Sequence, residues 1–304
     1  MKSSVKIWLQ LVRAQFFTAS IIPVLIGGLY AALYYTPILW GLFLITLLCA
    51  LFFHAGTNIV SEYFDYHAGV DKPHTYGSSR VLVEGLLPAR KALWAGMLLF
   101  LIGFLLGLML VRIRGLPILY LGILGLLGGY TYTGRPFGFK YKALGDVQVF
   151  IFMGVLLVAA PFFVLTGTYY LRVFLVSLPI SLLVTAILHA NNLRDIHHDK
   201  EANIKTLEST LGFKKARWGY FILLPAAYLA VGAMIAAKIL PLQVILVSLS
   251  LPLAAKNMGL LAKNKSGNAQ KIMTLDLMTA QLHLAFGSLF IIGLLLSLAS
   301  HTHV

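Results

Sequence analysis

The feature that most constrains this sequence is a series of nine apolar stretches, most of them about 20 residues long, separated by polar segments. They cover roughly residues 16–35, 38–60, 92–111, 116–133, 146–166, 172–190, 217–237, 240–256 and 278–299. A helix of about 20 apolar residues is long enough to cross a bilayer. Inside a bilayer, only helices and closed barrels satisfy all their backbone hydrogen bonds, and apolar runs of this length are typical of helices. We therefore expect an all-α membrane protein, a bundle of about nine transmembrane helices.

The composition agrees with this expectation. Charged residues make up 11% of the 304 residues, whereas soluble domains contain about 25%. No soluble domain is visible between the apolar stretches, so we treat residues 1–304 as one domain.

The net charge of +14 is unevenly distributed along the chain. If the N-terminus is cytoplasmic, only four of the 24 Lys and Arg residues face outward, namely Arg112, Arg114, Arg172 and Lys238, which leaves 20 on the cytoplasmic side. Such a bias is typical of cytoplasmic loops in membrane proteins. It explains the basic charge without a nucleic-acid partner. We expect a multi-pass protein with no obligate protein partner.

The acidic residues all lie on that same side or on helix ends next to it. They are Glu62, Asp65, Asp71, Glu84, Asp146, Asp195, Asp199, Glu201, Glu208 and Asp276. Acidic residues contribute little to membrane orientation, so their placement is independent of the basic bias. We therefore expect an active site that faces the cytoplasm and is capped by cytoplasmic loops.

Two long inner connections, about 61–91 and 191–216, contain related motifs. The first motif reads N-I-V-S-E-Y-F-D-Y-H-A-G-V-D-K-P from Asn58 to Pro73, and the second reads N-N-L-R-D-I-H-H-D-K-E-A-N-I-K-T-L from Asn191 to Leu207. Each follows an apolar helix, begins with Asn and continues with carboxylates and then basic residues. Two copies on one face indicate pseudo-symmetric halves that share a site.

The spacing in the first motif is helical. Asn58, Glu62 and Asp65 stand at i, i+4 and i+7 and therefore share one helix face. Asp71 follows Gly69, where the helix can end and the chain can turn back. In the second motif, Asn191, Asp195 and Asp199 stand at i, i+4 and i+8, again on one helix face.

Carboxylates crowded at the end of a membrane helix repel one another and are costly to desolvate. Hard oxygen ligands suit Mg²⁺, which proteins typically bind through one or two carboxylates plus substrate phosphates. Basic side chains that alternate with these acids are suited to bind a diphosphate. The candidates are Arg80, Lys140, Arg194 and Lys205. Acids and bases on one face thus predict a metal–diphosphate substrate.

Four segments resemble the UbiA superfamily of intramembrane prenyltransferases. Residues 13–23 resemble the family's entry to its first helix, and residues 54–73 resemble its first aspartate-rich motif. Residues 130–146, ending in G-F-K-Y-K-A-L-G-D, resemble the third inner loop of the menaquinone branch. Residues 191–207 resemble the second aspartate-rich motif, N-N-x-R-D-x-x-x-D with K-T-L downstream. This branch contains 1,4-dihydroxy-2-naphthoate polyprenyltransferases and the vitamin K2-synthesising enzymes of animals.

The sequence departs from the family pattern at two places. Ala14 stands where a proline is common, and Ser61 and Glu62 stand where many members have Asn-Asp. Glu62 is therefore the candidate metal ligand that matches the family least.

The resemblance implies Mg²⁺-dependent transfer of a polyprenyl group from an allylic diphosphate to an aromatic acceptor. In the menaquinone branch the acceptor is 1,4-dihydroxy-2-naphthoate, which gives demethylmenaquinone with loss of CO2 and diphosphate. The implied metal ligands are Asn58, Glu62, Asp65, Asp71, Asn192, Asp195 and Asp199, and the four aspartates among them are the implied catalytic residues. The implied substrate-binding residues are Arg13, Asn58, Arg80, Tyr132, Lys140, Asn191, Arg194 and Lys205.

Other functions remain open from the sequence. Within the family, 4-hydroxybenzoate, homogentisate or glyceryl phosphate are alternative acceptors. A membrane transporter would place acids near the middle of its spans, which these acids avoid. Among the histidines, His54 lies one turn before Asn58 and is expected to support it, whereas His189, His197 and His198 are expected to be structural or solvated.

Overall fold

The computed structural model describes residues 3–34, 38–73, 75 and 77–301, and in this part of the chain it is helical without β-strands. Eight helical stretches are long and apolar enough to cross a membrane, and a ninth apolar helix, α5, is shorter. Their bounds are α2 (Thr18–Tyr34), α3 (Trp40–His67), α4 (Ala89–Arg114), α5 (Leu116–Thr131), α6 (Gly145–Val149) continued by a π-helix (Phe150–Val155) and α7 (Leu156–Thr166), α8 (Leu171–Glu201), α10 (Phe213–Ala236), a 3-10 helix (Leu242–Ser250) continued by α11 (Leu251–Lys263), and α12 (Leu275–His301). The all-α membrane bundle expected from the sequence is confirmed.

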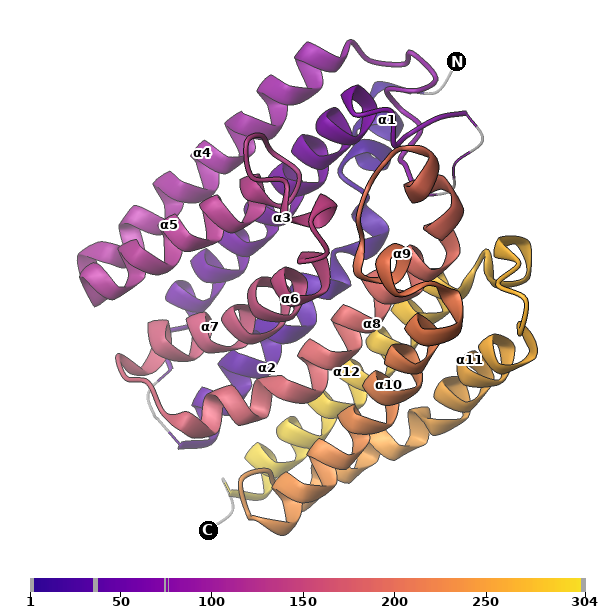
Figure 1. The fold of residues 1–304 in the computed structure, drawn as a ribbon. Helices are drawn as coiled ribbons and strands as arrows, with labels where there is room; N and C mark the ends of the chain where they lie inside the picture. Colours follow the sequence, from indigo (N-terminus) through magenta and orange to yellow (C-terminus); the bar gives the residue numbers. More distant parts are fainter. Residues whose placement is uncertain (1–2, 35–37, 74, 76, 302–304) are drawn as a thin grey trace.

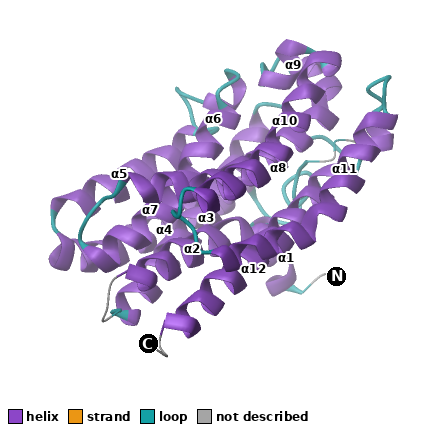
Figure 2. Cartoon of the chain, turned by 90° about the horizontal axis from the view of Figure 1, so that it is seen from below, coloured by secondary structure: helices purple, strands orange, loops and turns teal. Residues whose placement is uncertain are grey.

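Short helices lie between or before the long ones. They are α1 (Ser4–Leu11), α9 (Leu207–Leu211) and the 3-10 turns Ala14–Phe16, Phe139–Tyr141 and Ala269–Ile272. In Figure 1 the N-terminus and α9 lie at one end of the bundle and the C-terminus lies at the other. Nine membrane passes, the number predicted from the sequence, would place the termini at opposite ends in this way. Figure 2 shows the same helices from below, joined by loops.

Most of the buried apolar side chains form one core shared by α2, α7, α8, α10, α11 and α12. Glycine allows two of these helices to approach α2 closely. A Cβ at Gly27 would collide with the backbone of Val158 in α7, and a Cβ at Gly287 in α12 would collide with Ile22. The other side of the bundle, formed by α3, α4 and α5, packs through two smaller cores.

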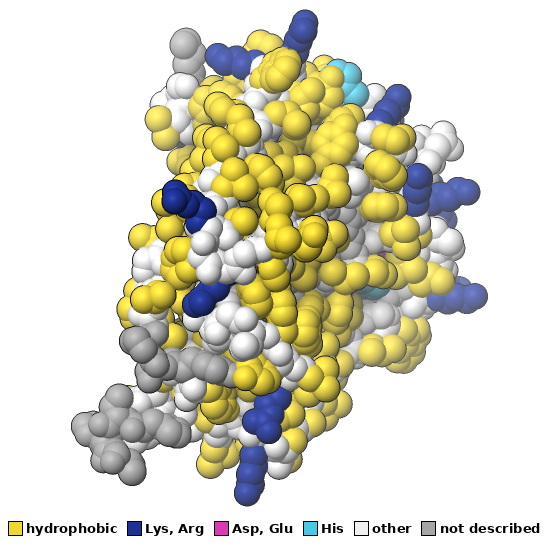
Figure 3. Space-filling view, turned by 90° about the vertical axis from the view of Figure 1, so that its left-hand side faces the viewer, with side chains coloured by type: hydrophobic (Ala, Val, Ile, Leu, Met, Phe, Trp, Pro, Cys, Tyr) yellow, Lys and Arg dark blue, Asp and Glu magenta, His cyan; other side chains and the backbone are white. Residues whose placement is uncertain are grey.

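The outer surface is largely hydrophobic, as a bilayer requires. Exposed apolar side chains follow α4, including Trp94, Leu98, Leu101 and Leu105. Figure 3 shows one face of the molecule, where hydrophobic side chains predominate and Lys and Arg side chains are scattered, mostly toward the edges. These exposed residues are the expected lipid contacts.

Two helices extend beyond the spans predicted from hydrophobicity. The apolar stretches end near residues 60 and 190, but α3 continues to His67 and α8 continues to Glu201. Each extension carries the acids of one motif. The motifs therefore lie on helix ends, and only their last residues lie in loops.

Candidate active site

The first motif ends in a turn that fixes the position of Asp71. Gly69 has a φ of +72°, a left-handed conformation that glycine adopts without strain. The Val70 N–H donates to the Asp65 carbonyl at 2.9 Å, and the Gly69 N–H donates to the Tyr66 carbonyl at 3.2 Å. This pair of bonds is a Schellman motif, which ends the helix and reverses the chain. The predicted turn at Gly69 is confirmed.

The second motif ends in the same way. Asn203 has a φ of +56°. The Ile204 N–H donates to the Asp199 carbonyl at 2.8 Å, and the Asn203 N–H donates to the Lys200 carbonyl at 3.1 Å. The two helix ends therefore share a backbone device, and it defines which residues correspond. Counting back from it pairs Asp65 with Asp199, Ser61 with Asp195 and Asn58 with Asn192; counting forward pairs Asp71 with Lys205.

Between these two helix ends lies a cavity of about 360 Å³ with a polar part and an apolar part. Most of the predicted site residues line the polar part: Arg13, Asn58, Asp65, Asp71, Tyr132, Lys140, Asn191, Asn192, Asp195 and Asp199. The structure thus brings together residues separated by more than 180 positions, since Arg13 and Asp199 share one cavity.

The apolar part runs between α3, α4, α5 and α7. Phe53, Phe104 and Phe152 line it together with glycines of α4 and α5. A Cβ built at Gly107 or Gly122 has no heavy atom within 4 Å, so the absence of side chains there leaves the space open. This geometry suits a long apolar group whose polar end lies among the aspartates.

Asp65 is held by two groups from the loop after α5. Lys140 Nζ donates to Asp65 Oδ2 at 2.8 Å, and the Tyr141 hydroxyl donates to Oδ1 at 2.7 Å. Burial alone would lower the pKa of Lys140, but the charge of Asp65 outweighs it and the pKa lies above its usual range. Lys140 therefore carries its charge on the wall of the cavity.

Asp71 is the least paired of these acids. Its Oδ2 is buried without a hydrogen-bond partner among the described residues. Burial, together with the charges of Asp65 and Glu62, raises the pKa of Asp71 to about 8. A cation bound next to Asp71 would stabilise its ionised carboxylate.

Asn58 and Glu62 bind the N-terminal segment. The Asn58 side-chain amide donates to the Val12 carbonyl at 2.8 Å, so its amide oxygen is the atom free to bind other groups. Glu62 is fully buried and pairs with Arg13 at 2.9 Å. It also accepts bonds from Ser79, from the N–H at 3.0 Å and from the hydroxyl at 2.6 Å. Both Glu62 oxygens are thus engaged, and Glu62 does not line the cavity. Its role as a metal ligand stays a prediction.

In the second motif, Arg194 forms a fork with Asp195. Its Nε and Nη2 each donate to Asp195 at 2.8 Å, and its Nη1 donates to Asp276 at 2.7 Å. With its amide oriented to satisfy both neighbours, Asn191 donates to Asp195 Oδ2 at 3.0 Å and accepts from Arg194 at 3.2 Å. Arg194 is buried behind the acids rather than on the cavity wall. It holds Asp195 in place, and its predicted contact with substrate stays a prediction.

Two further predicted diphosphate ligands, besides Arg194, do not line the cavity. Arg80 pairs with Glu84 at 2.8 Å on the surface. The Lys205 side chain is exposed, but its carbonyl accepts the Ala143 N–H at 2.6 Å. The loops that carry Lys140 and Lys205 are therefore joined by their backbones. Direct binding of substrate by Arg80 and Lys205 stays a prediction.

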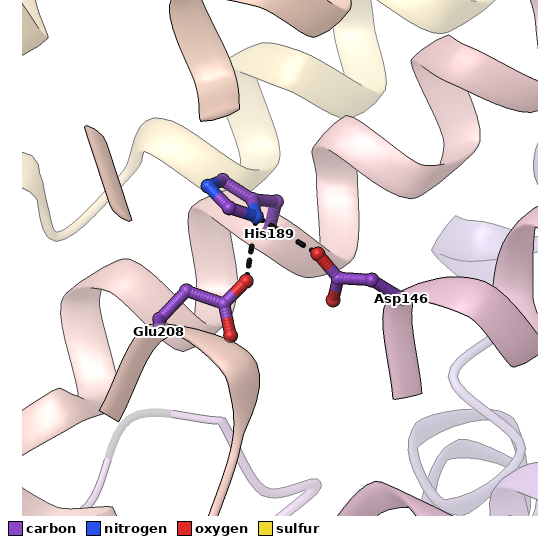
Figure 4. Close-up of side chains that lie close together, drawn as sticks. All are labelled: Asp146, His189 and Glu208. Carbon is purple, nitrogen blue, oxygen red and sulfur yellow. Dashed lines mark hydrogen bonds and ion pairs between the residues drawn. The ribbon is translucent and has the colours of Figure 1, made fainter. Parts of the chain in front are cut away.

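A second polar cluster, which the sequence did not predict, lies beside this cavity. His189, expected to be structural or solvated, lies between Asp146 and Glu208, as Figure 4 shows. By contrast, His197 is exposed and lies 3.4 Å from Glu201, as expected for a solvated residue. His54 is buried on the cavity wall, and its Nδ1 lies 2.8 Å from the Ser20 hydroxyl.

The chain is similar to known proteins over most of its length. The chain is 32% identical over 295 residues to 1,4-dihydroxy-2-naphthoate octaprenyltransferase of Bacillus subtilis, an alignment covering 95% of this chain and 92% of that protein. It is 31% identical to UbiA prenyltransferase domain-containing protein 1 of Rattus norvegicus, over 92% of this chain and 81% of that protein.

A solved structure shares the fold. The UbiA homologue of Archaeoglobus fulgidus bound to GPP and Mg²⁺ matches with a TM-score of 0.64 at 16% identity, covering 93% of this chain and 99% of that one. The model of the UbiA prenyltransferase family matches residues 20–282. The chain therefore belongs to the UbiA prenyltransferase family and is a multi-pass membrane prenyltransferase.

Proposed function

We propose that this enzyme transfers a polyprenyl group from an allylic diphosphate to 1,4-dihydroxy-2-naphthoate in a Mg²⁺-dependent reaction, which yields demethylmenaquinol (the reduced form of demethylmenaquinone), CO2 and diphosphate. The observation that carries the proposal is the two-part cavity, in which aspartates from both motifs lie at the end of an apolar tunnel. The choice of acceptor is supported by the Bacillus subtilis relative, which aligns over nearly the whole chain.

The charges on the cavity wall fit bound Mg²⁺. Among the described residues, five aspartates line the cavity, Asp65, Asp71, Asp195, Asp199 and Asp276. Three Lys and Arg side chains offset them: Arg13 and Lys140 on the wall, and Arg194 behind Asp195 and Asp276. This excess of negative charge would repel a diphosphate. Carboxylate and amide oxygens are the ligands that Mg²⁺ prefers, together with substrate phosphates.

We assign the ligands to the two halves defined by the helix ends. Asn58, Asp65 and Asp71 belong to the first half, and Asn192, Asp195 and Asp199 belong to the second. The unpartnered Oδ2 of Asp71 is the clearest available ligand atom. Bound Mg²⁺ supplies charge neutralisation of the leaving diphosphate.

The chain's own residues position the substrate. Lys140 and Arg13 contribute positive charge at the polar end of the cavity, where the diphosphate oxygens would lie. Tyr132 lies on the same wall, and an aromatic ring face turned toward the allylic cation would stabilise it. The prenyl tail occupies the tunnel lined by Gly107 and Gly122.

The reaction is balanced without an external base. The allylic carbon–oxygen bond breaks and its electron pair leaves with the diphosphate. The ring carbon of the naphthoate that bears the carboxylate then forms a bond to the allylic carbon. Loss of CO2 from the same ring carbon returns an electron pair to the ring and restores its aromaticity. The reaction needs a site closed to water at this step, because water would otherwise capture the cation.

We assign the capped end of the bundle to the cytoplasm. The positive-inside bias supports this orientation, because four of the 24 Lys and Arg residues belong to the opposite face. A water-soluble acceptor and a cytosolic diphosphate would then reach the site from the same compartment.

The decisive experiment is an acceptor panel with purified protein in detergent. The protein is incubated with Mg²⁺, geranylgeranyl diphosphate and one acceptor at a time: 1,4-dihydroxy-2-naphthoate, 4-hydroxybenzoate, homogentisate or glyceryl phosphate. Mass spectrometry should find a prenylated product only with the naphthoate, and that product should lack the carboxyl group. A prenylated product from another acceptor alone would reject the assigned acceptor, while leaving the family assignment intact.

A further inference from the structure

Three titratable side chains from three segments converge beside the active site. Asp146 lies in the first turn of α6, His189 lies in α8 and Glu208 lies in α9. Their exposed fractions are 7%, 2% and 0%. The His189 Nδ1 lies 2.8 Å from Asp146 Oδ2 and 2.6 Å from Glu208 Oε1, and Figure 4 shows the ring between the two carboxylates. The mechanism proposed above does not use this cluster.

The far side of the histidine ring fixes its tautomer. His189 Nε2 lies 2.8 Å from the Ala216 carbonyl, which can only accept a hydrogen bond. Nε2 therefore carries the hydrogen. In the neutral ring, the lone pair then belongs to Nδ1 and points toward the carboxylates. A backbone carbonyl that orients a histidine in this way is typical of metal-binding histidines.

The charges of the cluster do not balance. A protonated Nδ1 can direct its single N–H to one carboxylate, and the hydrogen bond goes to Asp146 Oδ2. Asp146 Oδ1 and both Glu208 oxygens have no hydrogen-bond partner in the described chain. No described Lys or Arg forms an ion pair with either carboxylate. Even an imidazolium ion would thus leave one buried negative charge, which is costly.

We propose that Asp146, His189 and Glu208 bind one divalent transition-metal ion of the Zn²⁺ type, at a site separate from the catalytic Mg²⁺. One ligand atom from each residue lies within 4.8 Å of the others, so one ion can reach all three. An imidazole nitrogen and two carboxylates are ligands typical of Zn²⁺, whereas Mg²⁺ prefers oxygen ligands alone. A neutral imidazole with two carboxylates also balances the two charges of the ion.

The position of the site suggests what the ion does. Asp146 directly follows the loop that carries Lys140, and Glu208 directly follows the loop in which Thr206 donates to Asp199 at 3.1 Å. His189 lies one turn before Asn192 on α8. An ion bound here joins two loops, the one that carries Lys140 and the one that carries Thr206, to α8, the helix of the second motif. Its role is structural, and it positions Lys140 and Asp199 without contacting the substrate.

The test uses Co²⁺ as a spectroscopic substitute for Zn²⁺ in the full-length protein. Because Co²⁺ can also bind catalytic aspartates, the background is the double variant Asp65→Asn/Asp195→Asn. After removal of metals with EDTA, added Co²⁺ should give visible d–d absorption that stoichiometric Zn²⁺ abolishes. Glu208→Gln in the same background should weaken Co²⁺ binding by about 100-fold or more, since a directly coordinating ligand is lost. Glu201→Gln, which changes an exposed glutamate of α8, should leave the spectrum unchanged.

Thermal unfolding in detergent gives a second readout that does not depend on the spectrum. Zn²⁺ should raise the melting temperature of the background variant and should not raise that of its Glu208→Gln derivative. If Glu208→Gln does not fold, Asp146→Asn takes its place in both measurements. Absence of both the absorption and the stabilisation in the background variant would overturn the proposal. Unchanged Co²⁺ absorption and Zn²⁺ stabilisation in the folded Glu208→Gln or Asp146→Asn derivative would also overturn it. In either case the cluster is a histidine–carboxylate network whose charge is balanced by protons.

Discussion

The backbone carbonyls of Asp65 and Asp199 occupy equivalent places, because each accepts an N–H from the residue five positions later as its helix ends, at 2.9 and 2.8 Å. The halves that they anchor differ in side chains. Ser61 in the first corresponds to Asp195 in the second, and Asp71 in the first corresponds to Lys205 in the second. Each half therefore offers one asparagine and two aspartates in the same order along the chain, but one of the two aspartates stands at a different position relative to the helix end.

The first prediction concerns the metal. Prenyl transfer should fall to background after EDTA treatment, because the five aspartates on the cavity wall then outnumber Arg13, Lys140 and Arg194 and repel the diphosphate. Addition of Mg²⁺ alone should restore the rate, measured as product formed per minute. Undiminished turnover in EDTA would contradict a Mg²⁺-bridged diphosphate.

The second prediction concerns one aspartate from each motif, Asp65 and Asp195. Asp65→Asn and Asp195→Asn should each lower kcat by about 10²–10³-fold or more, the usual cost of losing one preorganised charge at a reacting group. Thermal unfolding should show that both variants remain folded. Near-normal turnover by Asp65→Asn would remove the first half from the metal site.

The third prediction separates stability from chemistry at Glu62. Glu62→Gln leaves Arg13 without its buried partner and should lower the free energy of unfolding by about 3–5 kcal/mol, while kcat falls less than in Asp65→Asn. Glu84→Gln is the matched control, because its pair with Arg80 is partly exposed, with side-chain exposures of 34% and 49%. Glu84→Gln should lower the free energy of unfolding by about 0–1 kcal/mol. Equal melting temperatures for the two variants would argue against the structural role of Glu62.

The fourth prediction concerns Lys140. Lys140→Ala should raise KM for the prenyl diphosphate by roughly 10- to 100-fold, since a hydrogen bond to a charged group contributes about 1.5–3 kcal/mol. Lys142→Ala, two residues away and exposed, should have little effect. Initial rates at varied diphosphate and fixed acceptor measure the difference. Matching KM values in the two variants would place Lys140 outside the diphosphate site.

The fifth prediction concerns the tunnel. Gly122→Leu places a side chain in open space on the cavity wall, so it should reduce the use of geranylgeranyl diphosphate far more than that of geranyl diphosphate. The control is Gly232→Leu, at an exposed glycine of α10 that does not line the cavity. Rates with the two diphosphates, compared as a ratio, test this. If both variants keep the rate ratio of the unchanged enzyme for the two diphosphates, the prenyl tail does not bind in the tunnel.

The sequence predicted those features that depend on local patterns. Apolar length predicted the bundle, helical spacing placed Asn58, Glu62 and Asp65 on one helix face, and Gly69 predicted the turn before Asp71. Hydrophobicity ended the spans too early at residues 60 and 190, because the polar ends of α3 and α8 remain helical. A helix continues as long as its backbone bonds are made, whether or not its side chains are apolar.

Contacts between distant segments could not be predicted in this way. Arg13 reaches Glu62 across 49 positions, and His189 reaches Asp146 across 43. Spacing shows which residues share a helix face, but the partner on the next helix depends on how the bundle packs. For the same reason, the sequence grouped Arg80 with Lys140, although Arg80 lies on the surface and Lys140 on the cavity wall.

The packing of α2 against α12 sets the order in which the bundle can be completed during synthesis. Ile22 and Ile26 of the first apolar helix share a core with Phe286 and Phe290 of the last. Gly287 allows the two helices to meet closely. The ribosome makes α2 long before α12, so the earliest helix remains without its final neighbour until almost the entire chain has entered the membrane. A chain cut short before α12 would leave that face of α2 uncovered, and the membrane quality-control machinery would meet an incomplete bundle.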